Sequence, residues 1–298
     1  MSVTVASSPH PSSFIVYASQ VAAAIGCNRH KKPSDALELM WERVAPESFQ
    51  AALRRNGVES ETDRIDRIAT ASDDARGALQ RSMQTCATST DVAAEYDVAS
   101  RFVSGMNDLP DNDRKLVDSA IKRNLFTNYG TASEYQALVK VRETLGIDAR
   151  PDPTFYKLCV GTVRGVPVWI GGKIDAITPD NIVIEIKNRI RRLFYKVPFY
   201  EVVQVQCYLA LLDVSRGAVV ECITTAPGNS TINIVPVRRD RLLWTDTVVP
   251  KVKAFVHVFM DLLEDQAFQD EFLTSPRRAA VIQARVTTAA AAAAGGGR

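Results

Sequence analysis

Histidine and cysteine are scarce in this chain. The three histidines are His10, His30 and His257, which leaves little material for metal or triad chemistry based on imidazole. The five cysteines are odd in number, scattered, and without a C-x-x-C pair: Cys27, Cys86, Cys159, Cys207 and Cys222. A disulfide scaffold and a zinc ribbon are therefore not expected, and the sequence favours an intracellular, reducing compartment.

Several motifs of other protein classes are also missing. No apolar stretch reaches the length of a membrane span, and the N-terminus lacks a signal-peptide core, so no membrane partner is expected. The sequence contains no G-x-x-x-x-G-K-[ST] phosphate loop, no G-x-G-x-x-G after a strand and no G-x-S-x-G. ATP-driven motors, dinucleotide enzymes and serine hydrolases are thereby disfavoured.

Composition and charge are those of an ordinary globular protein. The 298 residues are 46% hydrophobic and 23% charged, with a formal net charge of +2. A net charge this small gives weak long-range attraction to nucleic acid, so any such contact has to come from local basic groups.

The most informative stretch is GKIDAITPDNIVIEIK, residues 172–187. Two apolar, β-branched segments flank the turn Pro179-Asp180-Asn181, which predicts a hairpin. Strand periodicity then places Glu185 and Lys187 on one face and the neighbouring isoleucines on the other, with Asp175 on the adjacent strand. Charged groups on strands this apolar are costly to bury unless something binds them.

A divalent metal ion would satisfy these charges. Mg²⁺ prefers oxygen ligands, which Asp175, Glu185 and the carbonyl of Ile186 could supply, and Mn²⁺ is the alternative ion. Lys187 would lie beside the attacking water and offset charge that builds up on a phosphate. The neighbouring metal cation and reduced solvation would disfavour its charged form, which suits partial duty as a base. The competing interpretation is a surface hairpin that carries a Glu–Lys pair.

Four motifs, in their order along the chain, resemble those of a known family. They are an N-terminal segment from Tyr17 to Glu42, the Tyr129–Glu134 segment YGTASE, Asp175 with Glu185-Ile186-Lys187, and the Gln204–Leu211 segment QVQCYLAL. Together they are similar to the PD-(D/E)XK nuclease superfamily, in particular the lambda-exonuclease/YqaJ-like viral recombinase type. The resemblance covers about residues 14–212.

The resemblance implies an α/β fold of restriction-endonuclease-like type: a sandwich with a mixed central sheet flanked by helices, plus a helical N-terminal elaboration. It also implies a Mg²⁺-dependent 5′→3′ exonuclease on double-stranded DNA ends, in viral or phage-type recombination or replication in the cytoplasm or nucleus of an infected cell. A single-strand annealing protein and self-association into a homo-oligomer would be its partners.

Individual roles follow from the same resemblance. Glu134 would join the metal ligands, and Gln204 rather than Gln206 would orient the lysine or water. Their alternatives are a first-turn helix acid at Glu134 and an ordinary half-buried amphipathic helix at Gln204.

Basic side chains suggest where DNA would lie. The run from Lys187 to Lys196 interleaves arginines with Phe194 and Tyr195, which could stack at a base, although such a run is more often a solvated face. The resemblance adds the region after residue 19 as the site of a 5′ end. The predicted DNA contacts are Ser19, Arg29, Lys32, Arg189, Arg191, Arg192 and Tyr208.

The chain divides as follows. Residues 1–12 and 275–298 are predicted to be disordered, the latter because of its alanine run and Gly-Gly-Gly-Arg ending. Residues 13–126 are predicted to be a helical region and insertion, and 127–274 the nuclease core. Within them we predict a helix from Thr131, strands at 156–163, 166–178, 182–188, 217–224 and 231–237, and helices at 198–213 and 239–266, the last interrupted at Pro250.

Two alternative functions stay open from the sequence. One is an endonuclease or junction-cleaving enzyme of the same superfamily. The other is a catalytically inactive, DNA-binding scaffold that retains the fold. All the residue types that catalysis in this superfamily requires are present in the sequence, which favours an enzyme over a scaffold.

Overall fold

The computed structural model describes residues 11–295. Most of the predicted disordered segment 1–12, and residues 296–298, lie outside the described residues. The strands are β1 (Phe14–Tyr17), β2 (Arg150–Pro151), β3 (Tyr156–Val163), β4 (Val166–Gly172), β5 (Ala176–Ile177), β6 (Val183–Asn188), β7 (Arg216–Ala226) and β8 (Asn229–Arg238). The helices are α1 (Ala18–Ala24), α2 (Pro33–Val44), α3 (Pro46–Asn56), α4 (Glu61–Ala71), α5 (Asp73–Arg81), α6 (Ser89–Ser104), α7 (Asp111–Leu145), α8 (Phe199–Leu211), α9 (Val249–Glu264), α10 (Gln266–Thr274) and α11 (Arg278–Gly295), with the π-helical turn η1 (Leu243–Val248) before α9.

The fold is α/β with mixed sheets, as the sequence predicts. The strands form two adjoining sheets, of order β1-β4-β3 and β2-β5-β6-β7-β8. β1 with β4 and β6 with β7 are parallel pairs, and the remaining neighbours are antiparallel. The single strand predicted over 166–178 is interrupted at residues 173–175, which separates β4 from β5. Asp175 lies in this interruption.

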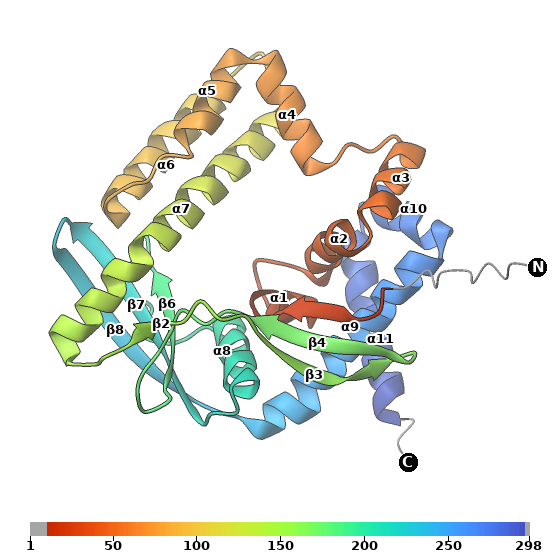
Figure 1. The fold of residues 1–298 in the computed structure, drawn as a ribbon. Helices are drawn as coiled ribbons and strands as arrows, with labels where there is room; N and C mark the ends of the chain where they lie inside the picture. Colours follow the sequence, from red (N-terminus) through yellow and green to blue (C-terminus); the bar gives the residue numbers. More distant parts are fainter. Residues whose placement is uncertain (1–10, 296–298) are drawn as a thin grey trace, which may run out of the picture.

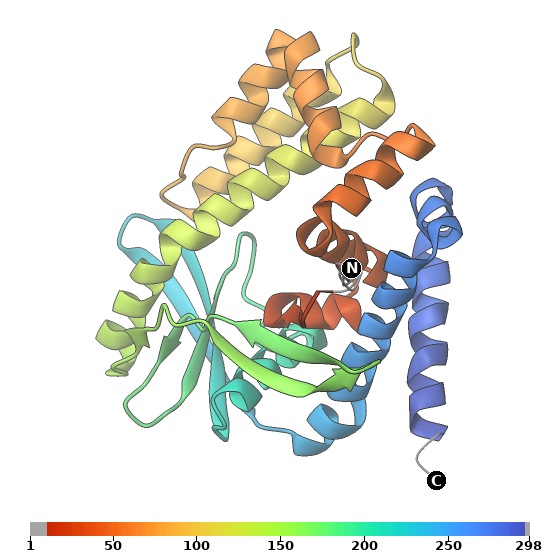
Figure 2. The ribbon, with the colours of Figure 1, turned by 45° about the vertical axis from the view of Figure 1, so that its right-hand side comes forward.

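Helices cover both faces of the larger sheet. Ile184 and Ile186 of β6 pack with Ala137 and Val141 of α7 in one apolar cluster. Val183 of β6 belongs to a second cluster, which includes Val203, Val205 and Leu209 of α8. The alternation along β6 therefore produces an α7–sheet–α8 sandwich, visible in Figures 1 and 2.

Helix α7 runs without a break through the boundary predicted at 126/127, so the prediction that a helix begins at Thr131 is wrong. Gly130 lies in mid-helix, where glycine costs only about 1 kcal/mol relative to alanine. Packing on both sides offsets this cost. Tyr129 and the residues before it join one apolar cluster, and Ala137 and those after it join another.

The predicted helical region 13–126 ends in α4, α5, α6 and the first half of α7, whereas α3, which also falls within the predicted insertion, packs with α2 and α10. The helices from α4 to the first half of α7 extend away from the sheets as an arm (Figure 1). Ile68, Leu79, Val92 and Ile121 belong to a small apolar cluster of its own, separate from those that cover the sheet. The ion pair between Arg64 and Asp113 joins α4 to α7 within the arm.

Residues 13–45 were predicted to be helical throughout, but they begin with a strand. β1 pairs in parallel with β4, from Phe14 opposite Val168 to Tyr17 opposite Gly171. Phe14 is fully buried and meets Phe259 of α9 edge to face, with ring centroids 5.6 Å apart. This segment is too short to show an alternating pattern of its own, and its strand conformation depends on a partner more than 150 residues away.

The predicted disorder of 275–298 is also wrong over the part of the tail that the structure describes. α11 packs beside α9 and α2, with Ile282 and Val286 buried in the main apolar cluster. Alanine has the highest helix propensity, so the low-complexity run continues a helix that its first turns anchor. The predicted helix 239–266 is η1 followed by α9; Pro250 has no N–H to bond to the carbonyl of Asp246, and the wide π-helical turn lies just before it.

The packing of α11 can be tested by truncation of one buried side chain. Ile282 is fully buried, so Ile282→Ala should lower the free energy of unfolding by about 2–5 kcal/mol. The matched control is Thr288→Ala, an exposed position on the same helix, which should change stability by less than about 0.5 kcal/mol. Urea unfolding measures both. Equal stabilities for the two variants would mean that the tail does not pack as described.

Candidate active site

The candidate site begins with Asp175, in the bend between β4 and β5. Its Oδ2 accepts a hydrogen bond of 2.7 Å from the backbone N–H of Ile186 on β6. This bond ties the bend to the strand that carries the other charged residues. Asp175 is half-buried, so its carboxylate remains close to the surface.

Glu185 and Lys187 project from the same face of β6, as predicted. Lys187 Nζ donates to Glu185 Oε1 at 2.6 Å. Glu185 is 2% exposed, and its second oxygen, Oε2, is buried without a hydrogen-bond partner. A buried carboxylate oxygen without a partner is costly in free energy, which marks this atom as a position for a ligand.

Helix α8 supplies two further polar groups to this face. Lys187 Nζ also donates to Gln204 Oε1 at 3.2 Å, and Gln204 Nε2 donates to the hydroxyl of Tyr208 at 3.0 Å. Gln204, not Gln206, therefore lies beside the lysine. Tyr208 is 4% exposed, so its prediction as a DNA contact is wrong: its hydroxyl is used to hold Gln204.

Gly172, at the end of β4, permits the close approach of α8 and α1. A Cβ at this position would lie 3.0 Å from Tyr208 Cε1 and 3.1 Å from the Cβ of Ala18. Both contacts are tighter than ordinary packing allows. The absence of a side chain at residue 172 thus lets Tyr208 and the start of α1 meet beside the charged cluster.

Glu134 reaches the same region from α7. Burial, and next the charge of Glu185, raise the pKa of Glu134, while Lys187 lowers it. Because α7 continues through residue 134, Glu134 is not a first-turn acid, and the helix-dipole explanation does not apply to it.

The buried acids of this cluster hold their protons more tightly than usual. Burial is the main cause in each case: it raises the pKa of Asp175, and that of Glu185 to about 7. Burial alone would lower the pKa of Lys187, but the charge and hydrogen bond of Glu185, together with the charges of Glu201 and Asp175, outweigh burial, and the pKa of Lys187 is raised. The protein by itself therefore favours the ammonium form, and the loss of this charge beside a bound metal cation stays a prediction.

The fit of these residues to a metal ion rests on two carboxylates. The part of the chain that the structure describes contains no group of three or more His, Cys, Asp or Glu side chains arranged to hold a metal ion. Mg²⁺ commonly takes only one or two protein carboxylates, with waters and substrate phosphates as its other ligands. Asp175 and the unpartnered oxygen of Glu185 fit that smaller set, and Ile186, the residue after Glu185, donates its backbone N–H to Asp175.

The predicted contacts for a 5′ end lie in α1 and in the connection to α2. Ser19 is exposed in the first turn of α1, next to Ala18, which approaches Gly172. Arg29 and Lys32 are exposed in the connection. Arg29 is close enough to α8 to influence the pKa of Tyr200, and the ring of His30 lies 5.7 Å from that tyrosine.

Arg189 was predicted to contact phosphate, and this requires a correction. Its guanidinium donates two hydrogen bonds to Glu201 and one to Glu221, each of 2.8 Å, and only 9% of the residue is exposed. All of its charge is used inside the protein. Arg189 is therefore a structural residue that joins β6 to α8 and β7.

The segment 190–197 follows this buried network. Glu221 accepts hydrogen bonds from the backbone N–H groups of Phe194 and Tyr195. Tyr195 has a φ of 57° and a side chain that is 69% exposed. Arg191 and Arg192 are exposed as well, and Arg191 lies 3.9 Å from the carboxylate of Asp97 on α6 in an exposed ion pair. The segment therefore carries two exposed cations and one exposed aromatic ring on a fixed backbone.

Glu201 and Glu221 were missed from sequence. A signal existed for their partner: Arg189 is two residues beyond Lys187 and continues the same face of the strand toward α8. The two glutamates lie on other elements, Glu201 on α8 and Glu221 on β7. Their pairing with Arg189 needs the tertiary fold.

The comparisons with known proteins give only distant likenesses. No protein-family model matches the chain, and no curated protein matches it in sequence. Among solved structures, the alkaline exonuclease LHK-Exo from Laribacter hongkongensis is 15% identical, with a TM-score of 0.39 over 63% of this chain and 94% of that one. A phage-related exonuclease from Haemophilus somnus 129PT is 15% identical (TM-score 0.36, 63% and 92% covered), and the protein SSO0001 is 16% identical (0.32, 68% and 94%). With TM-scores this low, the function has to be inferred from the residues of this chain.

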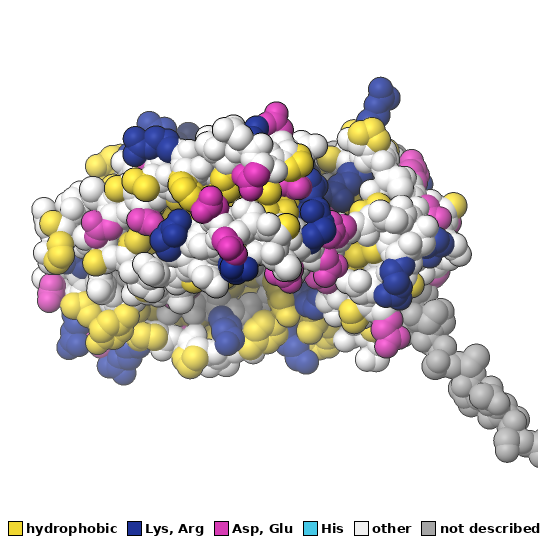
Figure 3. Space-filling model, turned by 90° about the horizontal axis from the view of Figure 1, so that it is seen from above, with side chains coloured by type: hydrophobic (Ala, Val, Ile, Leu, Met, Phe, Trp, Pro, Cys, Tyr) yellow, Lys and Arg dark blue, Asp and Glu magenta, His cyan; other side chains and the backbone are white. Residues whose placement is uncertain are grey.

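Two further observations complete the description of the molecule. No helix in residues 11–295 combines the length and the apolar character that crossing a bilayer requires. Seen from the side of the helical arm, acidic and basic side chains are intermixed (Figure 3). Neither observation identifies a partner.

The role of Arg189 can be tested through stability. Arg189→Met should lower the free energy of unfolding by about 3–5 kcal/mol, because it leaves two buried carboxylates without their cation. Arg192→Met, three residues along and exposed, should change it by less than about 0.5 kcal/mol. Thermal or urea unfolding measures the difference. If the two variants were equally stable, the buried ion pairs of Arg189 would be contradicted, and Arg189 would again be a candidate for contact with phosphate.

Proposed function

We propose that this protein is a divalent-metal-dependent deoxyribonuclease that hydrolyses phosphodiester bonds, as a 5′→3′ exonuclease on double-stranded DNA ends in viral or phage-type recombination or replication. The observation that carries the proposal is the buried cluster of Asp175, Glu185 and Lys187, in which one carboxylate oxygen has no partner. A surface hairpin with a solvent-exposed Glu–Lys pair would leave no buried oxygen unsatisfied.

In the proposed site, Asp175, Glu185 and the carbonyl of Ile186 hold Mg²⁺ or Mn²⁺, with Glu134 as a further or supporting ligand. The bound ion would polarise the phosphate and lower the pKa of the attacking water. The protein residues would position the attacking water and neutralise the negative charge on the phosphate. Lys187, held by Glu185 and Gln204, presents a charged ammonium to the water and to the developing negative charge on the phosphate.

Tyr208 and Gly172 act behind this cluster. The hydroxyl of Tyr208 accepts the hydrogen bond from Gln204 and so leaves the Gln204 carbonyl free to face Lys187. Gly172 provides the space that this tyrosine needs. These two residues are positioning residues, because neither would touch the substrate.

DNA would reach the cluster past the exposed basic groups on either side. Arg191 and Arg192 would contact the backbone, and Tyr195 could stack on a terminal base. Ser19, Arg29 and Lys32 would contact the 5′ end, near the start of α1, which lies beside Gly172.

One experiment separates this function from its alternatives. End-labelled linear duplex and covalently closed circles are incubated with Mg²⁺, Mn²⁺ or EDTA. An exonuclease degrades only the linear DNA and needs the ion, whereas an endonuclease also cuts the circles. Binding to DNA without cleavage of either substrate under all conditions would identify a scaffold and contradict the proposal.

The role of Lys187 is tested by removal of its amine. Lys187→Ala should lower the cleavage rate by roughly 10²–10³-fold, because the transition-state charge loses a preorganised cation. DNA binding should stay close to that of the wild type. Lys115→Ala, an exposed lysine of the arm, is the control and should cleave normally. Wild-type turnover by Lys187→Ala would remove this lysine from the mechanism.

The contact of the 190–197 segment with DNA is tested through salt. The double variant Arg191→Gln, Arg192→Gln should bind duplex DNA more weakly, and its plot of log affinity against log salt should be shallower by roughly 0.9 for each lost phosphate contact. Binding is measured in EDTA, which prevents cleavage. The double variant Arg54→Gln, Lys115→Gln removes the same charge elsewhere. If both double variants lowered the slope equally, the segment would have no specific contact.

A further inference from the structure

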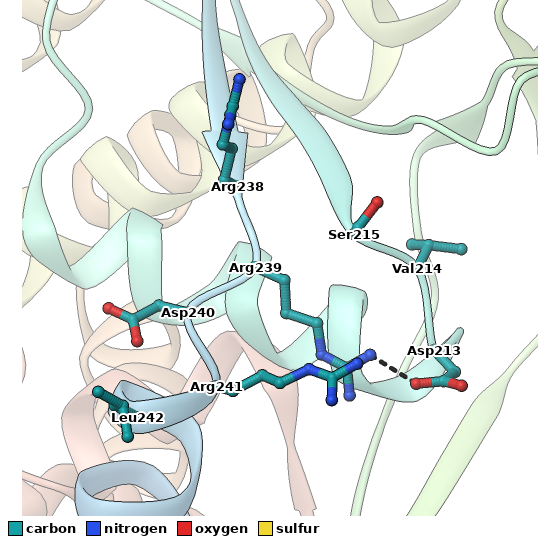
Figure 4. Close-up of a pocket in the computed structure, with 8 residues that line it drawn as sticks. All are labelled: Asp213, Val214, Ser215, Arg238, Arg239, Asp240, Arg241 and Leu242. Carbon is teal, nitrogen blue, oxygen red and sulfur yellow. Dashed lines mark hydrogen bonds and ion pairs between the residues drawn. The ribbon is translucent and has the colours of Figure 1, made fainter.

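A second concave site lies where β8 passes into η1, and the proposed function makes no use of it. A pocket of about 600 Å³ opens there, and its charged lining residues are Arg238, Arg239, Arg241, Asp213 and Asp240 (Figure 4). The carboxylate of Asp240 points away from Arg239 and Arg241 and accepts a hydrogen bond from the N–H of Leu243. It contains none of the residues of the Asp175–Glu185 cluster. Pockets of this size hold small ligands.

The corner that carries the arginines is held in place by a buried side chain. Gln206 of α8 is 2% exposed. Its Nε2 donates to the carbonyl of Arg238 at 2.7 Å, and its Oε1 accepts from the N–H of Asp240 at 2.8 Å. The N–H of Arg239 donates to the carbonyl of Ser215 at 3.0 Å. The pocket is therefore preorganised, which reduces the entropic cost of binding.

Positive charge at this corner exceeds what the protein neutralises. Arg216 and Arg238 are directly opposite each other on β7 and β8, an arrangement that repulsion between like charges destabilises. Within the described chain, neither they nor Arg241 have a carboxylate within ion-pair distance. Asp213 Oδ1 pairs at 2.5 Å with Arg239.

The guanidinium of Arg239 is itself only partly satisfied. Its Nε is buried and has no hydrogen-bond partner. Figure 4 shows the side chains of Arg239 and Arg241 extending toward the side of the pocket where Asp213 lies, whereas the side chain of Arg238 extends the other way. One carboxylate thus faces two guanidinium groups and forms an ion pair with one of them.

We propose that this pocket binds a terminal phosphate, carried by a free nucleoside monophosphate or by the phosphorylated end of a nucleic-acid strand. Such a phosphate has close to two negative charges and three acceptor oxygens, so it can bond several guanidinium groups at once. A single carboxylate can bond fewer guanidinium groups: Asp213 forms an ion pair with Arg239 and none with Arg241. Leu242, which is 72% exposed at the edge of the pocket, offers an apolar surface to the sugar or base.

Binding is measured by titration calorimetry in EDTA, so that the test involves no cleavage. A variant in the pocket leaves the proposed 5′-end contacts at Ser19, Arg29 and Lys32 intact, so the loss of binding that it causes reports on the pocket and not on the nuclease site. The probes are deoxyadenosine monophosphate, inorganic phosphate, and one short oligonucleotide with and without a 5′-phosphate. The variant Arg241→Gln should weaken binding of the phosphorylated probes at least tenfold. The Arg241 side chain is exposed and has no ion pair in the described chain, so this variant should fold normally.

Two further variants complete the design. Asp213→Asn removes the internal competitor for Arg239 and should tighten binding severalfold, which gives an opposite sign that general damage to the fold could not produce. Arg54→Gln, an exposed arginine of α3 without an ion pair, is the matched control and should bind as the wild type does. Tighter binding of the free nucleotide or of the phosphorylated strand then assigns the source of the phosphate.

Three results would overturn the proposal. The first is no binding of any phosphorylated probe, or equal binding by the wild type and Arg241→Gln. The second is a loss of affinity in Arg241→Gln that is the same for the oligonucleotide with and without its terminal phosphate. The third is tighter binding of a hexaglutamate peptide than of the nucleotide, which would identify the pocket as a docking site for an acidic protein segment.

Discussion

The burial of Glu185 under α8 is the constraint on which the candidate site depends. A carboxylate that is 2% exposed loses its hydration, and only Lys187 on the same strand offsets this loss through one of its two oxygens. Desolvation of this kind raises the pKa of a carboxyl group and strengthens its interaction with any cation that arrives. The arrangement is thus costly as it stands, and the binding of a second cation, as we propose, would offset this cost. In an ion pair with a purely structural role, we would expect the second oxygen of the carboxylate to be hydrogen-bonded or exposed to water, not buried without a partner.

One face of β6 and one stripe of α8 together produce this environment. Glu185, Lys187 and Arg189 follow each other at the two-residue period of a strand. Glu201, Gln204 and Tyr208 follow each other at the three- and four-residue spacings of a helix face. The two rows meet, so that Arg189 bonds Glu201 and Lys187 bonds Gln204. Arg189 therefore ties the end of this row of residues to α8, two positions after the lysine that is proposed to take part in catalysis. The same buried network fixes Glu221, whose carboxylate holds the backbone of the exposed segment with Tyr195.

The family resemblance predicted the sandwich and chose Gln204, whereas local patterns predicted much of the cluster, because its strand and helix faces depend on local periodicity. The apolar alternation along 183–188 and the turn before it were enough to place Glu185 and Lys187 on one face, and the spacing of Gln204 and Tyr208 placed both on one side of a helix. The failures involve partners that are distant in sequence. β1 needs β4, α11 needs α9 and α2, and Arg189 needs two acids on separate elements. Tyr208 was assigned to DNA because a sequence cannot show that Gly172 makes room for its ring beneath α1.

Helix α8 is positioned from both sides by side-chain hydrogen bonds, and this links the two sites in physical terms. Gln204 and Gln206 are two residues apart, about 200° around the helix, so they face different neighbours. Gln204 bonds the lysine on β6, whereas Gln206 bonds the backbone at the corner after β8. Apolar contacts alone tolerate small sliding movements, because they have little directional preference. Two directional anchors on different faces restrict the rotation and translation of α8. The distance from Gln204 to Lys187 is thereby set by the same helix position that holds the arginine corner in place.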